Sequence, residues 1–139
     1  MFHWVEARAF CHATEDEEKV AAAIRTVMAE GEVQRDTLEG TFGNPIVALA
    51  VRTEKAAEVR EFWRRLMTAM GKDAVLRDLD ARIDEDGVYH LRADKQRAYL
   101  GKIEPGASAD VIDVRAKVAA FPNKREIALR VAREFLEAL

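Results

Sequence analysis

Apolar residues recur along the chain at two different spacings, and these spacings divide it into predicted strands and helices. Residues 2–12 are rich in large or apolar side chains and contain neither Gly nor Pro, which predicts a strand. Residues 14–30 carry apolar side chains at helical spacing. We expect a helix that begins at Thr14, where Glu17 completes a capping box, and ends at Gly31. The side chains expected to form its buried stripe are Val20, Ala23, Ile24, Val27 and Met28.

The middle of the chain adds two more strands and the longest predicted helix. A weak strand is predicted at residues 32–39 and a turn at residues 40–45. Residues 46–51 are short and nearly all apolar, which is typical of a central strand buried on both faces or nearly so. Thr53 is expected to cap the following helix, which stops at Gly71. The apolar stripe of that helix is Val59, Phe62, Trp63, Leu66, Met67 and Met70.

The last third of the chain is predicted to add two further strands. Residues 73–82 predict a short helix, residues 84–87 a turn, and residues 88–93 a strand. Residues 94–101 fit either a short helix or a loop. Residues 109–119 alternate well between apolar and polar side chains, which predicts a strand with one apolar and one polar face. Its apolar face is Ile112, Val114, Ala116 and Val118, and its polar face is Asp113, Arg115 and Lys117.

Strands mixed irregularly with helices favour an α+β fold over a doubly wound sheet. We expect a two-layer domain that spans residues 1–139, because the chain contains no linker, repeat or low-complexity stretch. Asn123 is expected to cap the final helix. The helix positions expected to face the sheet are Val20, Ile24, Val27, Phe62, Leu66, Val131 and Phe135.

Composition places the chain among intracellular globular proteins. About half of the 139 residues are apolar, which suffices for a core without metal or disulfide support. There is no apolar run of membrane-spanning length and no signal peptide at the N-terminus, and the single cysteine, Cys11, has no internal partner. We therefore expect a cytoplasmic protein.

Charge alone is a poor indication of nucleic-acid binding here. The net charge is −3, from 22 basic and 25 acidic residues. The distribution is uneven, however, because residues 92–125 hold eight bases against four acids, whereas residues 15–18 are all acidic. A local basic surface is therefore compatible with the sequence.

Motifs for catalysis, metals or cofactors are absent from the sequence. The glycine-rich loop at residues 40–45 lacks the Gly-Lys-Ser/Thr of a phosphate-binding loop and the spacing of a dinucleotide fingerprint. Neither the three histidines nor Cys11 have zinc spacing, and residues 84–87 lack most of a calcium loop. We therefore expect a non-enzyme with no cofactor and no metal, with an enzyme that uses only carboxylates as a remote alternative.

Residues 89–101 interleave aromatic, cationic and amide side chains directly after a predicted strand. Such groups can grip phosphates and stack on bases. An ordinary amphipathic strand followed by a solvated turn explains the same composition, so this segment alone does not decide between the two interpretations.

Four strings, taken together, resemble an archaeal family of predicted RNA-binding proteins, or predicted exosome subunits. The strings are Thr14-Glu15-Asp16, Gly40-Thr41-Phe42-Gly43-Asn44-Pro45, Arg82-Ile83-Asp84-Glu85-Asp86-Gly87 and Leu91-Arg92-Ala93-Asp94-Lys95-Gln96-Arg97-Ala98-Tyr99-Leu100-Gly101. The resemblance spans nearly the whole chain in order. Ala93 stands where a larger apolar residue is expected, and Arg97 where a small one is expected. Neither departure breaks the match.

The resemblance implies a fold and a partner. The family is similar in fold to the ribosomal protein that binds 5S ribosomal RNA, which implies a mostly antiparallel sheet with helices packed on one face. It also implies RNA as the ligand and an exosome or another RNA-processing assembly as a protein partner. The alternative is an adaptor in such an assembly that makes no direct RNA contact, which the acidic residues 15–18 favour mildly.

The predicted RNA site combines the glycine-rich loop, the segment after residue 91 and the start of the final helix. We expect these three regions to converge on one face. Arg92 and Lys95 are expected to be stronger RNA contacts than Tyr99, because cations rarely belong in a core. Tyr99 and Gln96 have a structural alternative, in which the ring is buried and the amide fixes the turn. The predicted site residues are Gly40, Gly43, Asn44, Arg92, Lys95, Gln96, Arg97, Tyr99, Lys124 and Arg125.

Overall fold

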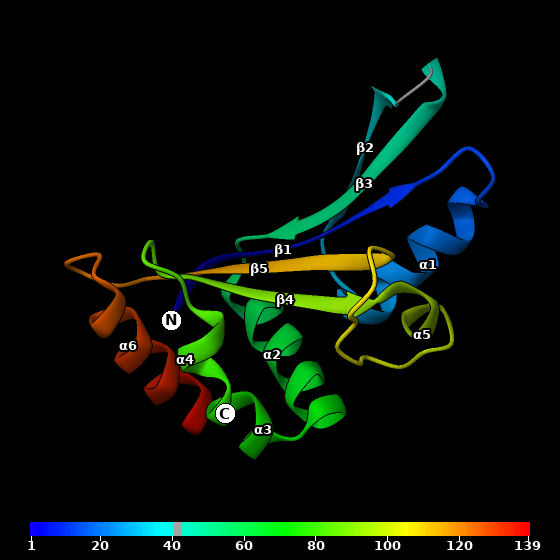
Figure 1. Ribbon diagram of the computed structural model, residues 1–139. Helices are drawn as coiled ribbons and strands as arrows, with labels where there is room; N and C mark the ends of the chain where they lie inside the picture. Colours follow the sequence, from blue (N-terminus) through cyan, green and yellow to red (C-terminus); the bar gives the residue numbers. More distant parts are fainter. Residues whose placement is uncertain (41–42) are drawn as a thin grey trace.

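The computed structural model describes residues 1–40 and 43–139, which fold into one antiparallel sheet with helices packed against it (Figure 1). The strands are β1 (Phe2–Cys11), β2 (Glu32–Glu39), β3 (Pro45–Thr53), β4 (Val88–Asp94) and β5 (Val111–Val118). The helices are α1 (Glu17–Val27), α2 (Ala56–Met70), α3 (Lys72–Arg77), α4 (Leu79–Arg82), α5 (Lys95–Tyr99) and α6 (Arg125–Glu137). The predicted two-layer α+β class is confirmed.

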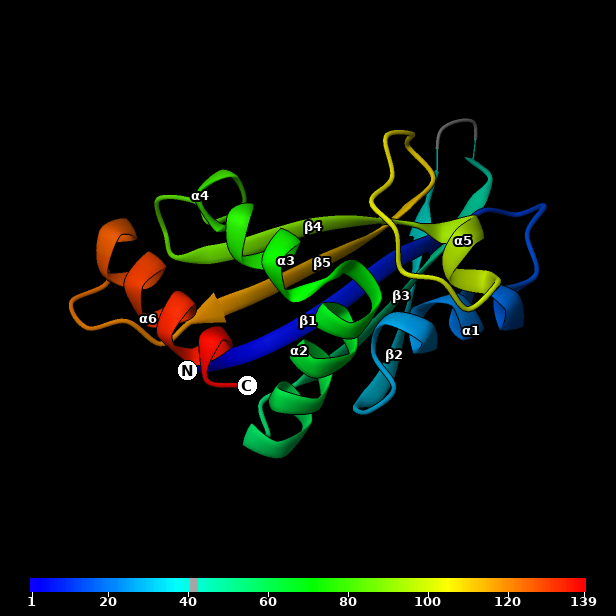
Figure 2. The same ribbon diagram turned by 90° about the horizontal axis from the view of Figure 1, so that it is seen from below.

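The strand order is β2-β3-β1-β5-β4, so the first strand of the chain lies in the middle of the sheet. β1 pairs with β3 on one side and with β5 on the other, both antiparallel. Among the described residues, the helices lie on one face of the sheet, as the view from below shows (Figure 2). The opposite face therefore carries side chains without a covering layer.

Alternation along β1 sends every second side chain into the core. Val5, Ala7, Ala9 and Cys11 are buried beneath the helices. A register irregularity between Phe2 and Trp4 resets the alternation, so Phe2 also reaches the core. The ring of Phe2 packs 4.7 Å from that of Trp63, which is fully buried in α2 and also contacts Tyr89 at 5.0 Å. Aromatic contacts thus join the beginnings of β1 and of the edge strand β4 to the longest helix.

The first helix begins and ends differently from the prediction. Asp16, not Thr14, is the N-cap, and its Oδ1 accepts a hydrogen bond from the backbone N–H of Glu18 at 3.0 Å. The helix ends at Val27 rather than at Gly31. Gly31 instead begins the turn into β2 with a φ of 108°, and a Cβ there would lie 2.9 Å from the carbonyl oxygen of Arg52.

The prediction of a strand at residues 46–51 that is buried on both faces or nearly so is confirmed in part, because each of these residues is buried or half-buried although no helix of the described residues covers the second face. β3 lies second from the edge, and its buried side chains Leu49, Val51 and Thr53 face the helices. On the other face Ala48 is buried, Ala50 is half-buried and Arg52, beyond the predicted segment, is exposed. Small alanines, rather than a second layer of helices, account for the apolar run. β2, at the edge, is exposed at every position.

The later elements confirm most of the predictions with local corrections. The expected helix at residues 73–82 is split into α3 and α4. Residues 94–101 contain the short helix α5, because the side chain of Asp94 accepts a hydrogen bond from the N–H of Arg97. Lys124 rather than Asn123 precedes α6, and Asn123 Oδ1 accepts a hydrogen bond from Lys117 instead.

Five of the seven helix positions expected to face the sheet are buried. Val131 and Phe135 are only partly buried, although both pack against the core. Thr53 does not occupy the cap position of α2, but its hydroxyl accepts a hydrogen bond from the N–H of Lys55 and contacts Glu58 at 2.6 Å. No helix among the described residues is both long and apolar enough to cross a membrane.

Candidate nucleic-acid interface

The uncovered side of the sheet, called the open face below, carries the side chains of Trp4, Glu6, Arg8 and Phe10 of β1 and their cross-strand neighbours. The strand register fixes these neighbours. Glu6 lies opposite Arg52 of β3 on one side and opposite Arg115 of β5 on the other. Because directly paired residues share a face, this places an Arg–Glu–Arg row across the three central strands.

The Glu6 carboxylate faces both arginines of that row. Its Oε1 accepts a hydrogen bond from Arg115 at 2.9 Å, and its Oε2 lies 3.9 Å from Arg52. The Glu6 side chain is 17% exposed, whereas the arginine side chains are 47% and 42% exposed. The guanidiniums therefore remain accessible from solution while the carboxylate lies lower between them.

Trp4 lies beside this row on β1. The guanidinium of Arg52 is 4.5 Å from the centre of its ring, and that of Arg115 is 6.0 Å away. These are cation–π distances, so the ring holds both arginines close to the sheet. A cationic, partly aromatic patch results at the centre of the open face.

A second row, one step along the strands, contains Arg8 and Arg92. Arg8 of β1 lies between Ala50 of β3 and Asp113 of β5, and Asp113 in turn lies opposite Arg92 of β4. The Arg92 side chain is 72% exposed and its Nε is 3.7 Å from Asp113, so this pairing leaves it open to solvent. Arg92 is thus the predicted site residue that lies on the open face.

Small side chains leave a shallow hollow between β1 and β2. Ala48 and Ala50 form its floor, with Arg8 on one side and Gln34 and Asp36 on the other. Phe10 lies beside it, is 41% exposed, and has the guanidinium of Arg8 5.2 Å from its ring centre. The open face thus offers two aromatic–arginine pairs along one strand, at Trp4 and at Phe10.

The glycine-rich loop lies at the same end of the sheet as the segment after β4, but on a different strand pair. It joins β2 to β3, whereas α5 follows β4, and strands β1 and β5 separate the two (Figure 1). The N–H of Gly40 donates to the carbonyl of Asn44 at 2.8 Å, and Gly43 has a φ of 74°. Thr41 and Phe42, which belong to the same string, lie outside the described residues.

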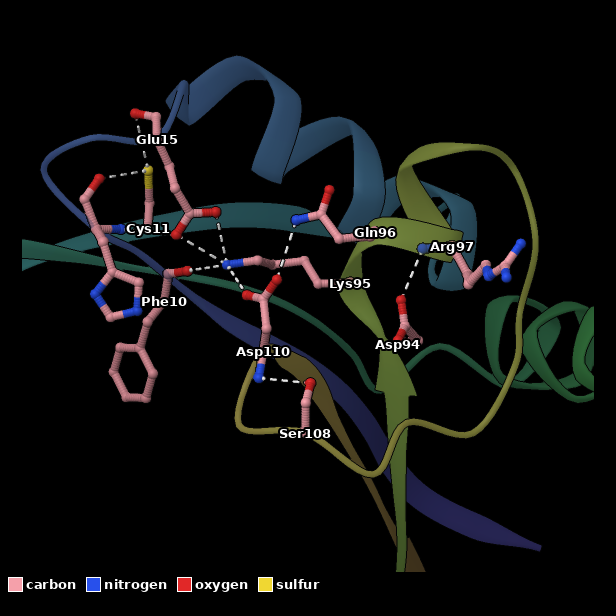
Figure 3. A network of polar contacts seen from close by, with 10 residues as sticks. Phe10, Cys11, Glu15, Asp94, Lys95, Gln96, Arg97, Ser108 and Asp110 are labelled. Carbon is pink, nitrogen blue, oxygen red and sulfur yellow. Dashed lines mark hydrogen bonds and ion pairs between the residues drawn. The ribbon is translucent and has the colours of Figure 1, made fainter.

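Lys95 is a correction to the predicted site. Its side chain is only 4% exposed, and its ammonium donates to the carbonyl of Phe10 and to Glu15 Oε1, both at 3.0 Å (Figure 3). Asp110 completes this Lys95 cluster, with Oδ1 2.6 Å from the ammonium. A cation in the interior is stable here because two carboxylates and a backbone carbonyl surround it. The expectation that Lys95 lies at the surface is therefore wrong.

The contacts within the Lys95 cluster change the pKa values of Lys95 and Asp110. Burial alone lowers the pKa of the Lys95 ammonium, but hydrogen bonds to Asp110 and Glu15 outweigh it, so this pKa lies above its ordinary value. Burial likewise raises the pKa of Asp110, but hydrogen bonds from Lys95 and Gln96 outweigh that effect and lower it. Both groups stay charged over the physiological range.

Gln96, Arg97 and Tyr99 lie around the short helix α5, away from the open face. The Gln96 amide donates to Asp110 Oδ2 at 3.0 Å, which agrees with the alternative that it fixes the turn. Arg97 lies 3.6 Å from Glu104. Tyr99 is 45% exposed, so the alternative that its ring is buried is wrong, and the ammonium of Lys19 lies 5.6 Å from the ring centre.

Lys124 and Arg125 do not join the other predicted residues. They follow β5, which runs away from α5, so they lie at the opposite end of the sheet, at the start of α6 (Figure 1). Arg125 there donates to the backbone carbonyls of Ile83 and Asp80, which ties α6 to α4. The prediction that all three regions converge on one face is therefore wrong.

Several residues of the family string from Leu91 to Gly101 have a structural role. Leu91 is in the core, Asp94 caps α5, Lys95 lies in its cluster, and Gln96 binds Asp110. Arg92, by contrast, points to the open face. A string that identifies a family can thus reflect what the fold needs rather than what the protein binds.

Outside the open face and the Lys95 cluster, the described parts of the chain hold few side chains that could act as metal ligands or nucleophiles. Among the described residues, no three His, Cys, Asp or Glu side chains are arranged to hold a metal ion. Cys11 is buried, and burial followed by the neighbouring Glu15 and Glu17 raises the pKa of its thiol, which opposes a reactive thiolate. His90 lies 2.7 Å from Asp84 at the edge of the open face, with no nucleophile in the pair.

Sequence reasoning missed Trp4, Arg8, Arg52 and Arg115 as one surface. The signal was present for β1, because Val5, Ala7, Ala9 and Cys11 alternate with Trp4, Glu6, Arg8 and Phe10. The strand order was not apparent from the sequence, and it alone brings Arg52 and Arg115 to the two sides of Glu6.

Comparison with known proteins places the chain in a family. A family model described as RNA binding matches residues 4–118. The RNA-binding protein PAB1135 of Pyrococcus abyssi is 37% identical, over 97% of this chain and 94% of that protein.

Solved archaeal structures share the fold. AF2318 of Archaeoglobus fulgidus superimposes with a TM-score of 0.84 at 39% identity, covering 96% of this chain and 99% of that one. Mth689 of Methanothermobacter thermautotrophicus gives 0.83 at 37% identity, covering 98% of both chains. The chain therefore belongs to the family that this RNA-binding model describes.

Proposed function

We propose that the protein binds RNA through the open face and does not convert it chemically. The observation that carries the proposal is the grouping of Arg8, Arg52 and Arg115 around two aromatic rings on an uncovered sheet. The family match and the name of the Pyrococcus relative support RNA as the class of ligand.

The chemistry of the open face suits a polyanion that also presents flat bases. Guanidiniums bind phosphate oxygens through paired N–H groups, and they stack on aromatic or base planes. Aromatic rings on a sheet surface offer stacking to unpaired bases. The net charge of −3 does not oppose this, because phosphate contacts depend on the local potential.

Two acids on the open face lie where they organise the arginines. Glu6 lies between Arg52 and Arg115, and Asp113 lies beside Arg92. Each pair spans neighbouring strands, so it fixes long side chains on the sheet surface before a ligand arrives. Such exposed pairs contribute little to stability, roughly 1 kcal/mol or less.

Equilibrium binding to a labelled RNA, measured over a series of KCl concentrations, tests the proposal. The double variant Arg8→Gln, Arg92→Gln removes two cations from the open face. The matched control, Arg60→Gln, Arg64→Gln, removes two exposed cations from α2 on the helical side. We expect the first variant to bind more weakly, with a flatter salt dependence, and the control to bind like the wild type. Equal weakening in both variants, or in neither, would contradict an interface on the open face.

The absence of catalysis is part of the proposal. Purified protein incubated with end-labelled RNA, with and without Mg²⁺, is expected to leave the RNA intact. Cleavage that persists through repurification and disappears in a point variant would show an enzyme instead.

The protein partner is a separate question. The family resemblance suggests an exosome or another RNA-processing assembly, and the alternative is an adaptor without RNA contact. The fully exposed edge strand β2 and the acidic start of α1 are the features that favour an adaptor. Capture of partners before and after nuclease treatment discriminates the two. Partners that disappear with the RNA support RNA binding, and partners that remain support the adaptor.

A further inference from the structure

We infer that the open face takes a single strand of RNA, and that one phosphate of this strand replaces the Glu6 carboxylate between Arg52 and Arg115. The inference rests on the proposed RNA binding and adds the form of RNA and the position of one contact. It starts from the Arg–Glu–Arg row, in which one anionic side chain serves two cations from neighbouring strands.

The geometry of this row is that of an occupied anion site. One carboxylate oxygen lies 2.9 Å from Arg115 and the other 3.9 Å from Arg52. Arginine stays protonated at all physiological pH values, so both cations need an anion or water nearby. A phosphate likewise offers a pair of oxygens, and it can approach from above the sheet, where both guanidiniums are exposed.

Glu6 can yield this position because its contacts are uneven. The Arg52 contact, at 3.9 Å, is an ion pair without a hydrogen bond, while Arg52 also binds Glu54 at 3.2 Å. The carboxylate therefore holds the arginines near Trp4 in the free protein and competes with RNA for them. Removing its charge while keeping its shape should strengthen RNA binding.

The stacked pair beside the row determines which form of RNA fits. The guanidinium of Arg52 lies over the ring of Trp4, 4.5 Å from its centre, and the Arg52 side chain is 42% exposed. An unpaired base can stack on that guanidinium plane, or on the ring itself if the side chain moves aside. Bases inside a duplex have both faces covered by neighbours, so a duplex can reach the arginines only through its phosphates.

Phe10 gives the strand a second contact on the same face. It lies six residues from Trp4 along β1, about 20 Å away at the rise of a strand, with Arg8 between the two rings. The hollow over Ala48 and Ala50 opens beside this path. A short unpaired segment that follows β1 would meet a ring at each end and cations between them.

The test compares Glu6→Gln with Glu61→Gln, a matched removal of one negative charge on the helical side in α2. Affinities for an unstructured oligoribonucleotide and for a duplex of the same composition are measured by anisotropy at low salt. We expect Glu6→Gln to bind the single strand severalfold more tightly than the wild type and Glu61→Gln to be unchanged. Unchanged or weaker binding by Glu6→Gln would overturn the inference.

Trp4 supplies an independent readout. Trp63, the other tryptophan, is fully buried, so quenching of fluorescence by single-stranded RNA should come from Trp4 and disappear in Trp4→Phe. Trp4→Leu, which keeps apolar volume without a ring, should weaken single-strand binding about tenfold and duplex binding much less. Equal affinity of the wild type for both forms would refute the choice of single strands.

These experiments distinguish a failure of the single-strand site from a failure of the proposed RNA binding. Wild-type binding that is indifferent to Glu6 and Trp4 leaves RNA binding in place and removes this site. No binding to either RNA at low salt contradicts both.

Discussion

The open face and the Lys95 cluster both place cations beside carboxylates, yet the two arrangements differ in what surrounds them. On the open face the arginines lie on one side of a sheet, with much of each side chain in solvent. In the Lys95 cluster a single ammonium is enclosed by Glu15, Asp110 and the carbonyl of Phe10. The first arrangement can exchange its anion for a ligand, whereas the second holds strand β1 and helix α5 together.

The largest expected effect is on stability. Lys95→Met should lower the free energy of unfolding by about 3 kcal/mol, because it leaves two carboxylates facing each other beside a buried carbonyl. Urea denaturation measures this change. Lys102→Met, an exposed cation in the loop after α5, is the control and should change stability by less than about 0.5 kcal/mol. Similar losses of unfolding free energy in the two variants would show that the Lys95 cluster contributes no more to stability than an exposed lysine.

The next largest effect is on RNA binding, in variants that should keep the stability of the wild type. Arg8→Gln, Arg92→Gln should keep the stability of the wild type within about 0.5 kcal/mol, because both side chains are exposed. The slope of log affinity against log salt should become shallower by about 0.7 for each phosphate of single-stranded RNA that the variant no longer binds. A variant with both weaker binding and lower stability would show that these arginines support the fold.

A smaller effect is the pH dependence of the cluster. The lowered pKa of Asp110 makes its contribution present above the ordinary value of 3.8 and lost as the pH falls through the folded-state value. The raised pKa of Lys95 makes its contribution present below 10.5 and lost only as the pH rises through a still higher value. The stability difference between wild type and Lys95→Met should therefore be constant from about pH 5 to pH 9 and shrink below about pH 4. Denaturation at about pH 7 and about pH 3 measures it, and an unchanged difference at the lower pH would contradict the charged pairing.

The smallest effect concerns a buried polar group outside both regions. The Tyr89 hydroxyl is buried without a hydrogen-bond partner among the described residues, and burial raises its pKa to about 12. Tyr89→Phe should therefore leave the free energy of unfolding unchanged within about 1 kcal/mol or increase it slightly. A decrease of more than about 2 kcal/mol would show that the hydroxyl has a partner, for instance an ordered water. The same urea assay as for Lys95→Met gives a direct comparison.

Much of the fold was predictable because periodicity is local. The strand at residues 109–119 and the stripe from Val59 to Met67 follow from the spacing of apolar residues. The caps were harder, since Asp16 and Thr14 are equally good caps by type and only the path of the chain decides between them. That the second face of β3 has no covering layer was also hard to predict, because alanine is compatible with both an interior and an open surface.

The candidate site was less predictable because it depends on strand order. Arg92 was predicted to contact RNA, and it lies on the open face. Lys95 was predicted to contact RNA for the same reason, its positive charge. Only the structure shows the difference, because Glu15 and Asp110 enclose Lys95 and leave it buried. Arg52 and Arg115 are 63 residues apart in the chain, and nothing in the sequence between them indicates that they share a carboxylate.

The position of β1 in the middle of the sheet has a consequence for biosynthesis. The first strand leaves the ribosome first, but its partner β5 ends at Val118, and the pairing joins Phe2 to that last residue. Until then β1 lacks one neighbour and the arginine row lacks Arg115. The nascent chain therefore cannot complete the sheet, or the surface proposed to receive RNA, before β5 has been translated. Contacts this distant in sequence also slow folding.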